Sequence, residues 1–181
     1  MRWTRGVEAP WLILSSIIGA GAGLVAGWGA MFPATVVFAS LLFAVLGVLF
    51  IIDARTTYLP DPWMIIAGVL VLAHPLAVSA TTDLVAGLLL LMLALVGASI
   101  GFCFFMTTRI LTGQLGLGDV KLAAVLGGWL LPLGWSALGT GFIIAALAGA
   151  AWMGVSLARG RSTAAYGPAM IAGAILATGL S

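Results

Sequence analysis

The sequence has five acidic residues, and Asp119 has the most unusual surroundings of them. It lies in the segment 116–121, which reads GLGDVK, inside a short polar break at 107–121 between long apolar runs. A carboxylate at membrane depth is costly, so such a residue normally faces a wet cavity or a partner. The two glycines of this segment, Gly116 and Gly118, allow another backbone or a peptide to approach closely. A Gly-rich turn with a solvated aspartate is the alternative interpretation, and the choice between the two depends on a second acid.

Asp53 is that second acid, because it ends an apolar run at 33–52 just as Asp119 precedes one at 122–138. Two carboxylates brought close together cannot both ionise easily, so they share a proton. One then acts as a base on water while the other, protonated, polarises a carbonyl group. This is aspartic-peptidase chemistry, which requires no metal and no organic cofactor. Asp61 competes with Asp53 for the role, but its place between Pro60 and Pro62 favours a loop or capping acid.

Other chemistries lack the residues that they need. The chain has one histidine and one cysteine, which excludes an intrachain disulfide and a multi-cysteine zinc site. It contains no phosphate-binding loop. We interpret His74, which precedes Pro75 near the end of an apolar run, as a residue of the membrane interface rather than a metal ligand. The sequence therefore predicts neither a metal site nor a cofactor.

The composition indicates that these acids belong to a membrane protein. Residues are 63% hydrophobic and only 7% charged, with a mean hydropathy of +1.26, far from the composition of a soluble domain. We predict an all-α, polytopic bundle of six to seven transmembrane helices that forms a single domain over 1–181, with no separate soluble domain. The apolar runs are 10–31, 33–52, 63–78, 84–106, 122–138, 139–158 and 166–181. The last run is short for a full crossing, which favours tilt, partial re-entry or local thinning.

Gly19, Gly23 and Gly27 form a stripe of small residues at a spacing of four in the first run. Such a stripe lets helices pack closely in lipid, and we interpret it as packing only. Arg2 and Arg5 before an apolar run also fit a cleaved signal peptide. The length and glycine content of the run, and the lack of a polar cleavage region, favour a membrane span.

The basic residues predict the orientation. The polar segments 1–9, 53–62, 107–121 and 159–166 are separated by two spans each, so they share one side of the membrane. All seven basic residues lie in these segments, whereas the opposite side has only Asp83; they are Arg2, Arg5, Arg55, Arg109, Lys121, Arg159 and Arg161. The positive-inside rule places this side, and the N-terminus, in the cytoplasm. The alternative, that the cations snorkel at either interface, does not explain a one-sided distribution.

Three stretches resemble the type IV prepilin peptidases. Asp53, followed after six residues by Pro60-Asp61, is similar to their first signature. The GxGD motif made by Gly116, Gly118 and Asp119, which continues into Val-Lys-Leu with Lys121, is similar to the second. Tyr166-Gly167-Pro168, with Ala172-Gly173 soon after, resembles a third stretch near the last helix. The resemblance covers the chain from the second span onward.

The resemblance implies an aspartic endopeptidase of the bacterial cytoplasmic membrane, with Asp53 and Asp119 as its catalytic pair. Gly116 and Gly118 would shape the turn that holds Asp119. Such enzymes cut the short basic leader from prepilins and pseudopilins at the cytoplasmic face, usually after a glycine and before the hydrophobic helix. The expected partners are therefore a substrate helix and membrane lipid, and no nucleic acid. Presenilin-like proteases also carry GxGD but pair it with a Tyr-Asp motif, whereas Ile52 precedes Asp53 here.

This chain departs from the larger, bifunctional members, whose N-terminal domain carries paired CxxC motifs linked to N-methylation. With one cysteine and nine residues before its first span, it resembles the short, peptidase-only branch that serves Tad/Flp-type or similar pili. Lys121 either lowers the pKa of Asp119 by proximity or anchors its helix at the headgroups, and base rates favour the anchor. Arg159 and Arg161 act first as topology signals, and anionic lipid is a second possible ligand.

Two other functions remain open from the residues alone. A small proton-coupled transporter would use the two acids as a relay, but it would need polar groups in the middle of several spans. A non-enzymatic assembly subunit would pack through its glycines and would not need two acids at matched depth.

Overall fold

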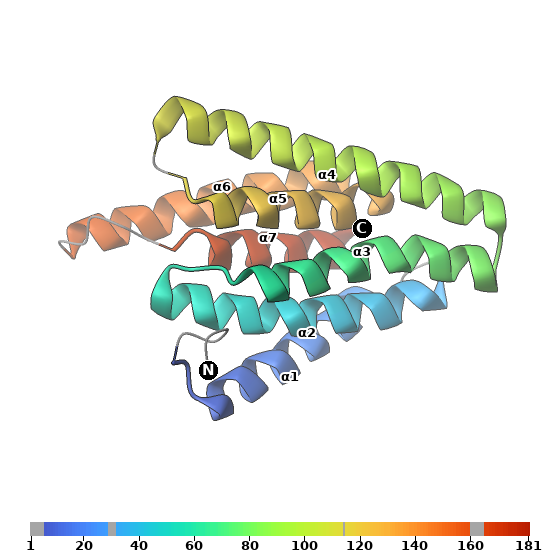
Figure 1. Cartoon of the computed structure of the whole chain (residues 1–181), viewed down its shortest axis with the longest axis horizontal. Coiled ribbons are helices and arrows are strands. Elements are labelled where there is room, and N and C mark those ends of the chain that lie inside the picture. Colours follow the sequence, from blue (N-terminus) through green and yellow to red (C-terminus); the bar gives the residue numbers. More distant parts are fainter. Residues whose placement is uncertain (1–5, 29–31, 114, 160–164) are drawn as a thin grey trace.

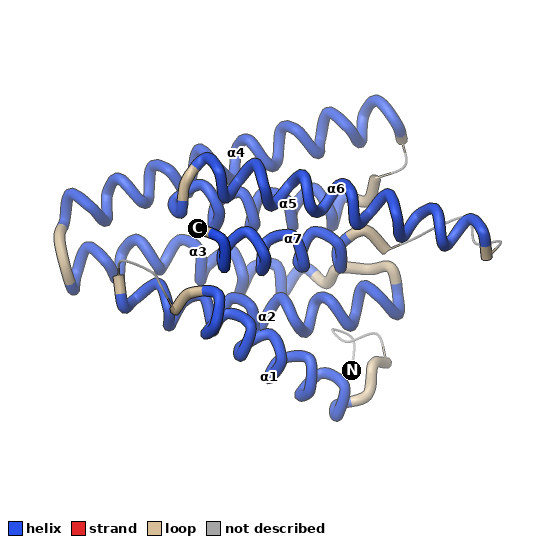
Figure 2. The backbone as a smooth tube through the Cα atoms, turned by 180° about the vertical axis from the view of Figure 1, so that it is seen from behind, coloured by secondary structure: helices blue, strands red, loops and turns tan. Residues whose placement is uncertain are grey.

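The structure is a computed structural model, and it describes residues 6–28, 32–113, 115–159 and 165–181. These residues form seven α-helices and no strands, as the composition predicts. The helices lie roughly side by side in one bundle (Figures 1 and 2). Their bounds are Ala9–Ala26 (α1), Pro33–Thr56 (α2), Asp61–Thr81 (α3), Leu84–Thr112 (α4), Leu117–Leu130 (α5), Trp135–Ala158 (α6) and Gly167–Leu180 (α7).

Five helices are long and apolar enough to cross a membrane: α1, α2, α3, α4 and residues Trp135–Ser156 of α6. A stretch of about 20 residues is needed to span the hydrocarbon core, so these five make the chain a multi-pass membrane protein. The helices α5 and α7 have 14 residues each. α7 is the segment that we expected to be short, and α5 is shorter than the predicted run.

The predicted bounds of the fifth and sixth runs need correction. α5 begins at Leu117 rather than at 122, because Asp119 in its first turn accepts a hydrogen bond from the Gly116 N–H and starts the helix there. It ends before Pro132, where the 3₁₀ turn Leu131–Leu133 (η1) follows. Gly134 then adopts a φ of 134°, and α6 begins at Trp135 rather than at 139. Asp119 therefore belongs to a helix and not to the loop before it.

The core lies where α2, α5 and α7 meet. α5 buries most of its side chains, and Trp129 donates a hydrogen bond from Nε1 to the Thr178 hydroxyl of α7 at 3.1 Å. The Phe43 ring of α2 contacts Trp129 edge-on, with ring centroids 6.3 Å apart. These contacts fix the C-terminal ends of the short helices α5 and α7 inside the bundle.

The interpretation of His74 as an interfacial residue is wrong. Only 3% of its surface is exposed, and α3 continues past Pro75 to Thr81. Its Nε2 lies 2.8 Å from the Thr35 hydroxyl of α2, and its ring lies 5.3 Å from that of Trp129. The hydrogen bond to Thr35 satisfies the buried imidazole, so His74 joins α3 to α2 in the core.

The glycine stripe of α1 packs as predicted. A Cβ on Gly19 or Gly23 would collide with the backbone of α2 at Phe43 and Ala39, and one on Gly27 would lie 3.2 Å from the Ala39 Cβ. α4 and α5 are fastened in the same way, since Gly97 and Gly127 each face the other's carbonyl oxygen. Absence of a Cβ therefore sets the distance between neighbouring helices in this bundle.

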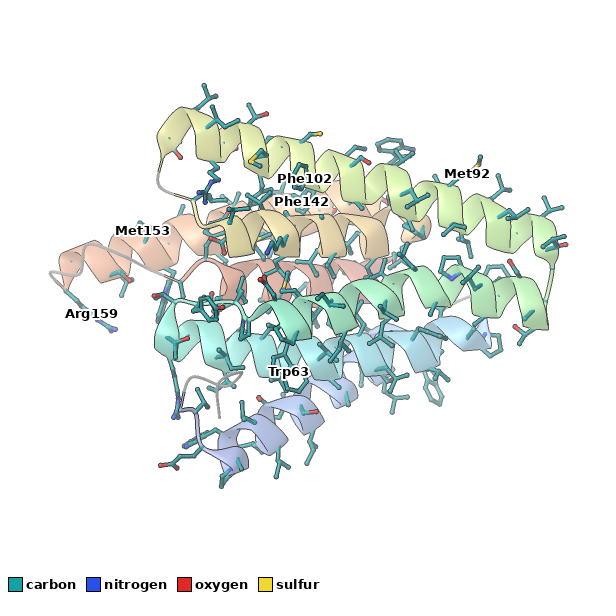
Figure 3. All side chains as sticks on the ribbon, viewed as in Figure 1. Trp63, Met92, Phe102, Phe142, Met153 and Arg159 are labelled. Atoms are coloured by element: carbon teal, nitrogen blue, oxygen red, sulfur yellow. The ribbon has the colours of Figure 1, made fainter. Side chains whose placement is uncertain are left out.

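The polar segments gather at one end of the bundle. The end of α2, the start of α3, the end of α4 and the start of α5 all lie at the left of Figure 1. Arg159, which follows α6, extends beyond the bundle at the same end (Figure 3). Among the predicted cytoplasmic cations, Arg55, Arg109, Lys121 and Arg159 belong to these termini. Arg2, Arg5 and Arg161 lie outside the described residues, and the side of the membrane stays a prediction.

Candidate functional site

Asp53 lies in the last turn of α2 and is almost completely buried, with 4% of its surface exposed. The helix ends immediately after it, at Thr57, which adopts a left-handed φ of 52°. The N–H of Gly167 at the start of α7 donates a hydrogen bond to the Asp53 Oδ2 at 3.0 Å. A free N–H at a helix N-terminus is a natural partner for a carboxyl oxygen. The first motif is therefore held by the third, 114 residues away along the chain.

A side chain at Gly167 would displace the Asp53 carboxyl group from this contact. A Cβ at that position would lie 2.6 Å from the Asp53 Oδ2 and 3.3 Å from its carboxyl carbon. Pro168 occupies the first turn of α7, where its missing N–H costs nothing and its fixed φ starts the helix directly after Gly167. The role of Gly167 as a hydrogen-bond donor to Asp53 did not follow from the sequence. The resemblance of Tyr166-Gly167-Pro168 to a third family stretch singled out this position without giving that role.

Asp119 lies in the first turn of α5, and its Oδ2 accepts a hydrogen bond from the Gly116 N–H at 3.2 Å. Gly118 faces the loop that follows Asp53, since a Cβ on it would lie 3.0 Å from the Leu59 Cβ. The two glycines thus do different things. Gly116 supplies an N–H to the carboxyl group, and Gly118 lets the α2–α3 loop pack against the start of α5.

The structure brings Asp53 and Asp119 into one cavity. This cavity has a volume of about 480 Å³, and it opens at the polar end of the bundle. Its lining comes from the α2–α3 loop with the start of α3, from the GxGD stretch, and from the segment before α7: Asp53, Thr57, Tyr58, Leu59, Asp61, Gly116, Leu117, Gly118, Asp119, Lys121, Ala165 and Tyr166. All three stretches singled out in the sequence therefore meet here.

The surroundings of the cavity make ionisation of its acidic groups less favourable. Burial raises the pKa of Asp119, and the hydrogen bond from the Gly116 N–H opposes this shift without cancelling it. Burial and the nearby Asp119 carboxylate also raise the pKa of the Tyr166 phenol. Tyr166 therefore stays a neutral hydroxyl beside the acids. Its ring packs against Phe105 of α4, with centroids 6.1 Å apart.

Asp61 and Lys121 form an ion pair at the edge of the cavity, with the Lys121 Nζ 2.6 Å from the Asp61 Oδ1. Asp61 is the first residue of α3 and follows Pro60, which is buried. It is 62% exposed at the side chain, in contrast to the burial of Asp53. The pair links the start of α3 to α5, a contact that neither interpretation of Lys121 foresaw.

Arg109 supports the second motif from α4. Its Nη1 donates to the Leu115 carbonyl oxygen at 2.9 Å, just before Gly116. The sequence assigned Arg109 only to the topology signal, so this contact was missed. α4 ends at Thr112, and Gly113 adopts a left-handed φ of 66°. Arg109 thus fixes the short connection that leads from α4 to the turn holding Asp119.

The arrangement suits hydrolysis by a pair of acids. Two carboxyl groups in one cavity can share a proton, so that one activates a water molecule while the other donates a hydrogen bond to a carbonyl oxygen. Within the described residues, no three His, Cys, Asp or Glu side chains are grouped as metal ligands would be. The two carboxyl groups in the cavity supply acid–base chemistry.

Comparison with protein families gives one match. The model of the type IV leader peptidase family matches residues 40–154, which include Asp53, the Asp61–Lys121 pair and Asp119. A comparison with curated proteins found no match, and a comparison with solved structures found none.

Proposed function

The chain belongs to the type IV leader peptidase family, and from that premise we propose that it is an aspartic endopeptidase that removes the basic leader from type IV prepilins or pseudopilins. The observation that carries the proposal is the cavity lined by both Asp53 and Asp119, with Asp53 anchored by the Gly167 N–H. The family match covers both acids but does not assign their roles. The geometry supports the pair because Asp53 is buried and Asp119 is partly buried, whereas Asp61, the third acid that lines the cavity, is exposed.

In the proposed mechanism, the pair holds one proton and one negative charge. The ionised carboxylate takes a proton from water, whose oxygen attacks the carbonyl carbon of the scissile peptide bond. The protonated carboxyl group donates a hydrogen bond to the carbonyl oxygen and stabilises the charge that develops there. The tetrahedral intermediate then breaks at the C–N bond, and the leaving amine takes a proton from the pair.

The proposed location is the bacterial cytoplasmic membrane, with the cavity at the cytoplasmic face. The support is the gathering of Arg55, Arg109, Lys121 and Arg159 at the same end as the cavity. A substrate whose apolar helix lies in the bilayer would present the bond that precedes this helix at that depth. The short, peptidase-only branch fits the single cysteine of the sequence.

The test is cleavage of a tagged prepilin, co-expressed with the wild type or a variant and followed by a gel shift. Asp53→Asn and Asp119→Asn should each abolish processing at normal membrane levels. Asp83→Asn is the matched control, because Asp83 caps α4 at the other end of the bundle and asparagine caps equally well. If either cavity variant still cleaves, that acid is not catalytic, and Asp61→Asn becomes the next variant.

A further inference from the structure

A second cavity lies beside the first, on the outer face of the bundle between α3, α4 and α5. Its volume is about 410 Å³. The lining is apolar except at the edge where Asp61 and Lys121 lie, and it consists of Asp61, Met64, Ile65, Phe102, Lys121, Ala124 and Val125. Ile65 and Phe102 are 65% and 41% exposed, so the cavity opens on the apolar surface that a multi-pass protein turns to lipid. We call it the α3–α5 groove.

The groove results from how α3 and α4 diverge. The two helices pack closely near their connection, where a Cβ on Gly87 would collide with Pro75 and Ser79. Toward the polar end they move apart, and α5 lies between them (Figure 1). α5 is fastened to α4 through Gly97, Gly101 and Gly127, and its small Ala124 leaves space on the α3 side. Phe102, labelled on α4 in Figure 3, borders that space.

The groove adjoins the cavity of the two acids. Asp61 and Lys121 line both, and their ion pair crosses from α3 to α5 at the boundary. Both side chains are about half exposed, so the pair contributes little to stability and can part to let a peptide pass. A chain that leaves the groove at this boundary enters the cavity beside Asp119.

A third cavity, of about 280 Å³, is lined by residues of α1, α2 and α7 such as Ile18, Ala22 and Phe50. It is apolar and faces outward like the α3–α5 groove. None of its lining residues lines the cavity of the two acids. It therefore provides a matched apolar surface without the connection.

We propose that the α3–α5 groove is the seat of the substrate's apolar transmembrane helix, from which the extended segment before that helix passes the Asp61–Lys121 pair into the cavity. The proposal rests on the proposed function, because it assigns the binding surface for the same reaction. An apolar helix buries its side chains in a lipid-facing groove, while its extended leader has unpaired backbone groups that need the polar cavity. The α3–α5 groove leads from an apolar surface to the polar cavity, whereas the third cavity shares no lining residue with that cavity.

Photo-crosslinking tests whether the substrate helix binds in the α3–α5 groove. Single cysteines replace Ile65 in the groove and Ile18 in the third cavity, which are 65% and 63% exposed, in a Cys103→Ser, Asp119→Asn background that cannot cut. Each cysteine receives a benzophenone maleimide, and the membranes contain a synthetic prepilin with a basic leader, a glycine and an apolar helix. We expect about tenfold more prepilin adduct at position 65 than at 18. Equal adducts, or lipid adducts alone at position 65, overturn the proposal.

A variant that fills the α3–α5 groove with a large side chain tests the proposal independently, through the KM of cleavage. Ala124→Trp should raise the KM for the synthetic prepilin about tenfold with a much smaller change in kcat, because it removes binding that substrate and transition state share. Ala22→Trp fills the third cavity in the same way and should leave KM unchanged. If Ala124→Trp reduces membrane levels, Ile65→Trp replaces it on the exposed side of the groove. A KM that is insensitive to groove filling overturns the proposal, and failure of the wild type to cut the prepilin instead overturns the proposed function.

Discussion

The α1–α2 pair and the α3–α4 pair are each made of two consecutive helices, and they differ in how far they stay in contact. Along α1 and α2, Gly19, Gly23 and Gly47 each bring backbone against backbone, at successive levels. Along α4, Gly87 packs against α3 near their connection, but Gly97 and Gly101 pack against α5 instead. The positions of a few glycines thus decide which helix pair stays closed and which diverges toward the polar end.

The two helix pairs therefore contribute differently: one holds α2 in place, and the other leaves an opening beside α5. The closed pair holds the long α2, whose last turn carries Asp53, against the rest of the bundle. The diverging pair leaves room for α5, whose first turn carries Asp119, and for the α3–α5 groove beside it. A glycine that contacts one of the two acids should therefore matter for cleavage, and a glycine in the closed pair should matter for stability. The predictions below test this distinction.

Gly167→Ala should have the largest effect on cleavage. The new Cβ would lie 2.6 Å from the Asp53 Oδ2, so the carboxyl group has to move. A displacement of about 1 Å at a reacting group can cost about 100-fold in rate, and we expect a loss of that size in kcat with little change in stability. The measurement is prepilin cleavage by purified variants. Gly179→Ala is the control on the same helix, where the nearest atom lies 3.8 Å away.

Gly23→Ala should instead destabilise the protein by about 2–3 kcal/mol, because the added Cβ meets the backbone of α2 at Ala39 and Ser40 and the two helices must separate. Unfolding in detergent measures this. Gly21→Ala is two residues away on the same helix and faces open space, so it should be neutral. Equal stability of the two variants would mean that α1 and α2 are not held by this contact.

Much of the helical architecture, and the shared location of the two acids, could be predicted from the sequence. Apolar runs predicted the helices, and counting spans predicted that Asp53 and Asp119 share one end. Contacts between distant segments were not predictable, because nothing local encodes them: the Gly167 N–H on Asp53, the Lys121–Asp61 pair and the His74–Thr35 hydrogen bond. The start of α5 was misplaced for a related reason. A helix boundary predicted from hydropathy falls where polar residues begin. Here the hydrogen bond between Gly116 and Asp119 starts the helix inside that polar segment.

Bridging the diverging helices should reduce cleavage of a membrane substrate about tenfold. Cysteines at positions 65 and 102, in a Cys103→Ser background, place one thiol on each side of the groove. A bismaleimide that joins them covers the proposed seat, and cleavage of the synthetic prepilin before and after joining is the measurement. Single cysteines treated with the same reagent control for labelling. Undiminished cleavage by the joined protein would place the substrate on another face.

The smallest effect is expected from the Asp61–Lys121 pair, because both side chains are largely exposed and an exposed ion pair contributes only about 0.2–1 kcal/mol to stability. A double-mutant cycle with Lys121→Gln and Asp61→Asn, read as unfolding free energies in detergent, isolates the coupling between the two residues. A coupling within that range means that α5, packed between α3 and α4, fixes their separation and that the pair is free to part. A coupling above about 2 kcal/mol would mean that the ion pair holds α3 and α5 together. The boundary between groove and cavity would then be closed to a peptide.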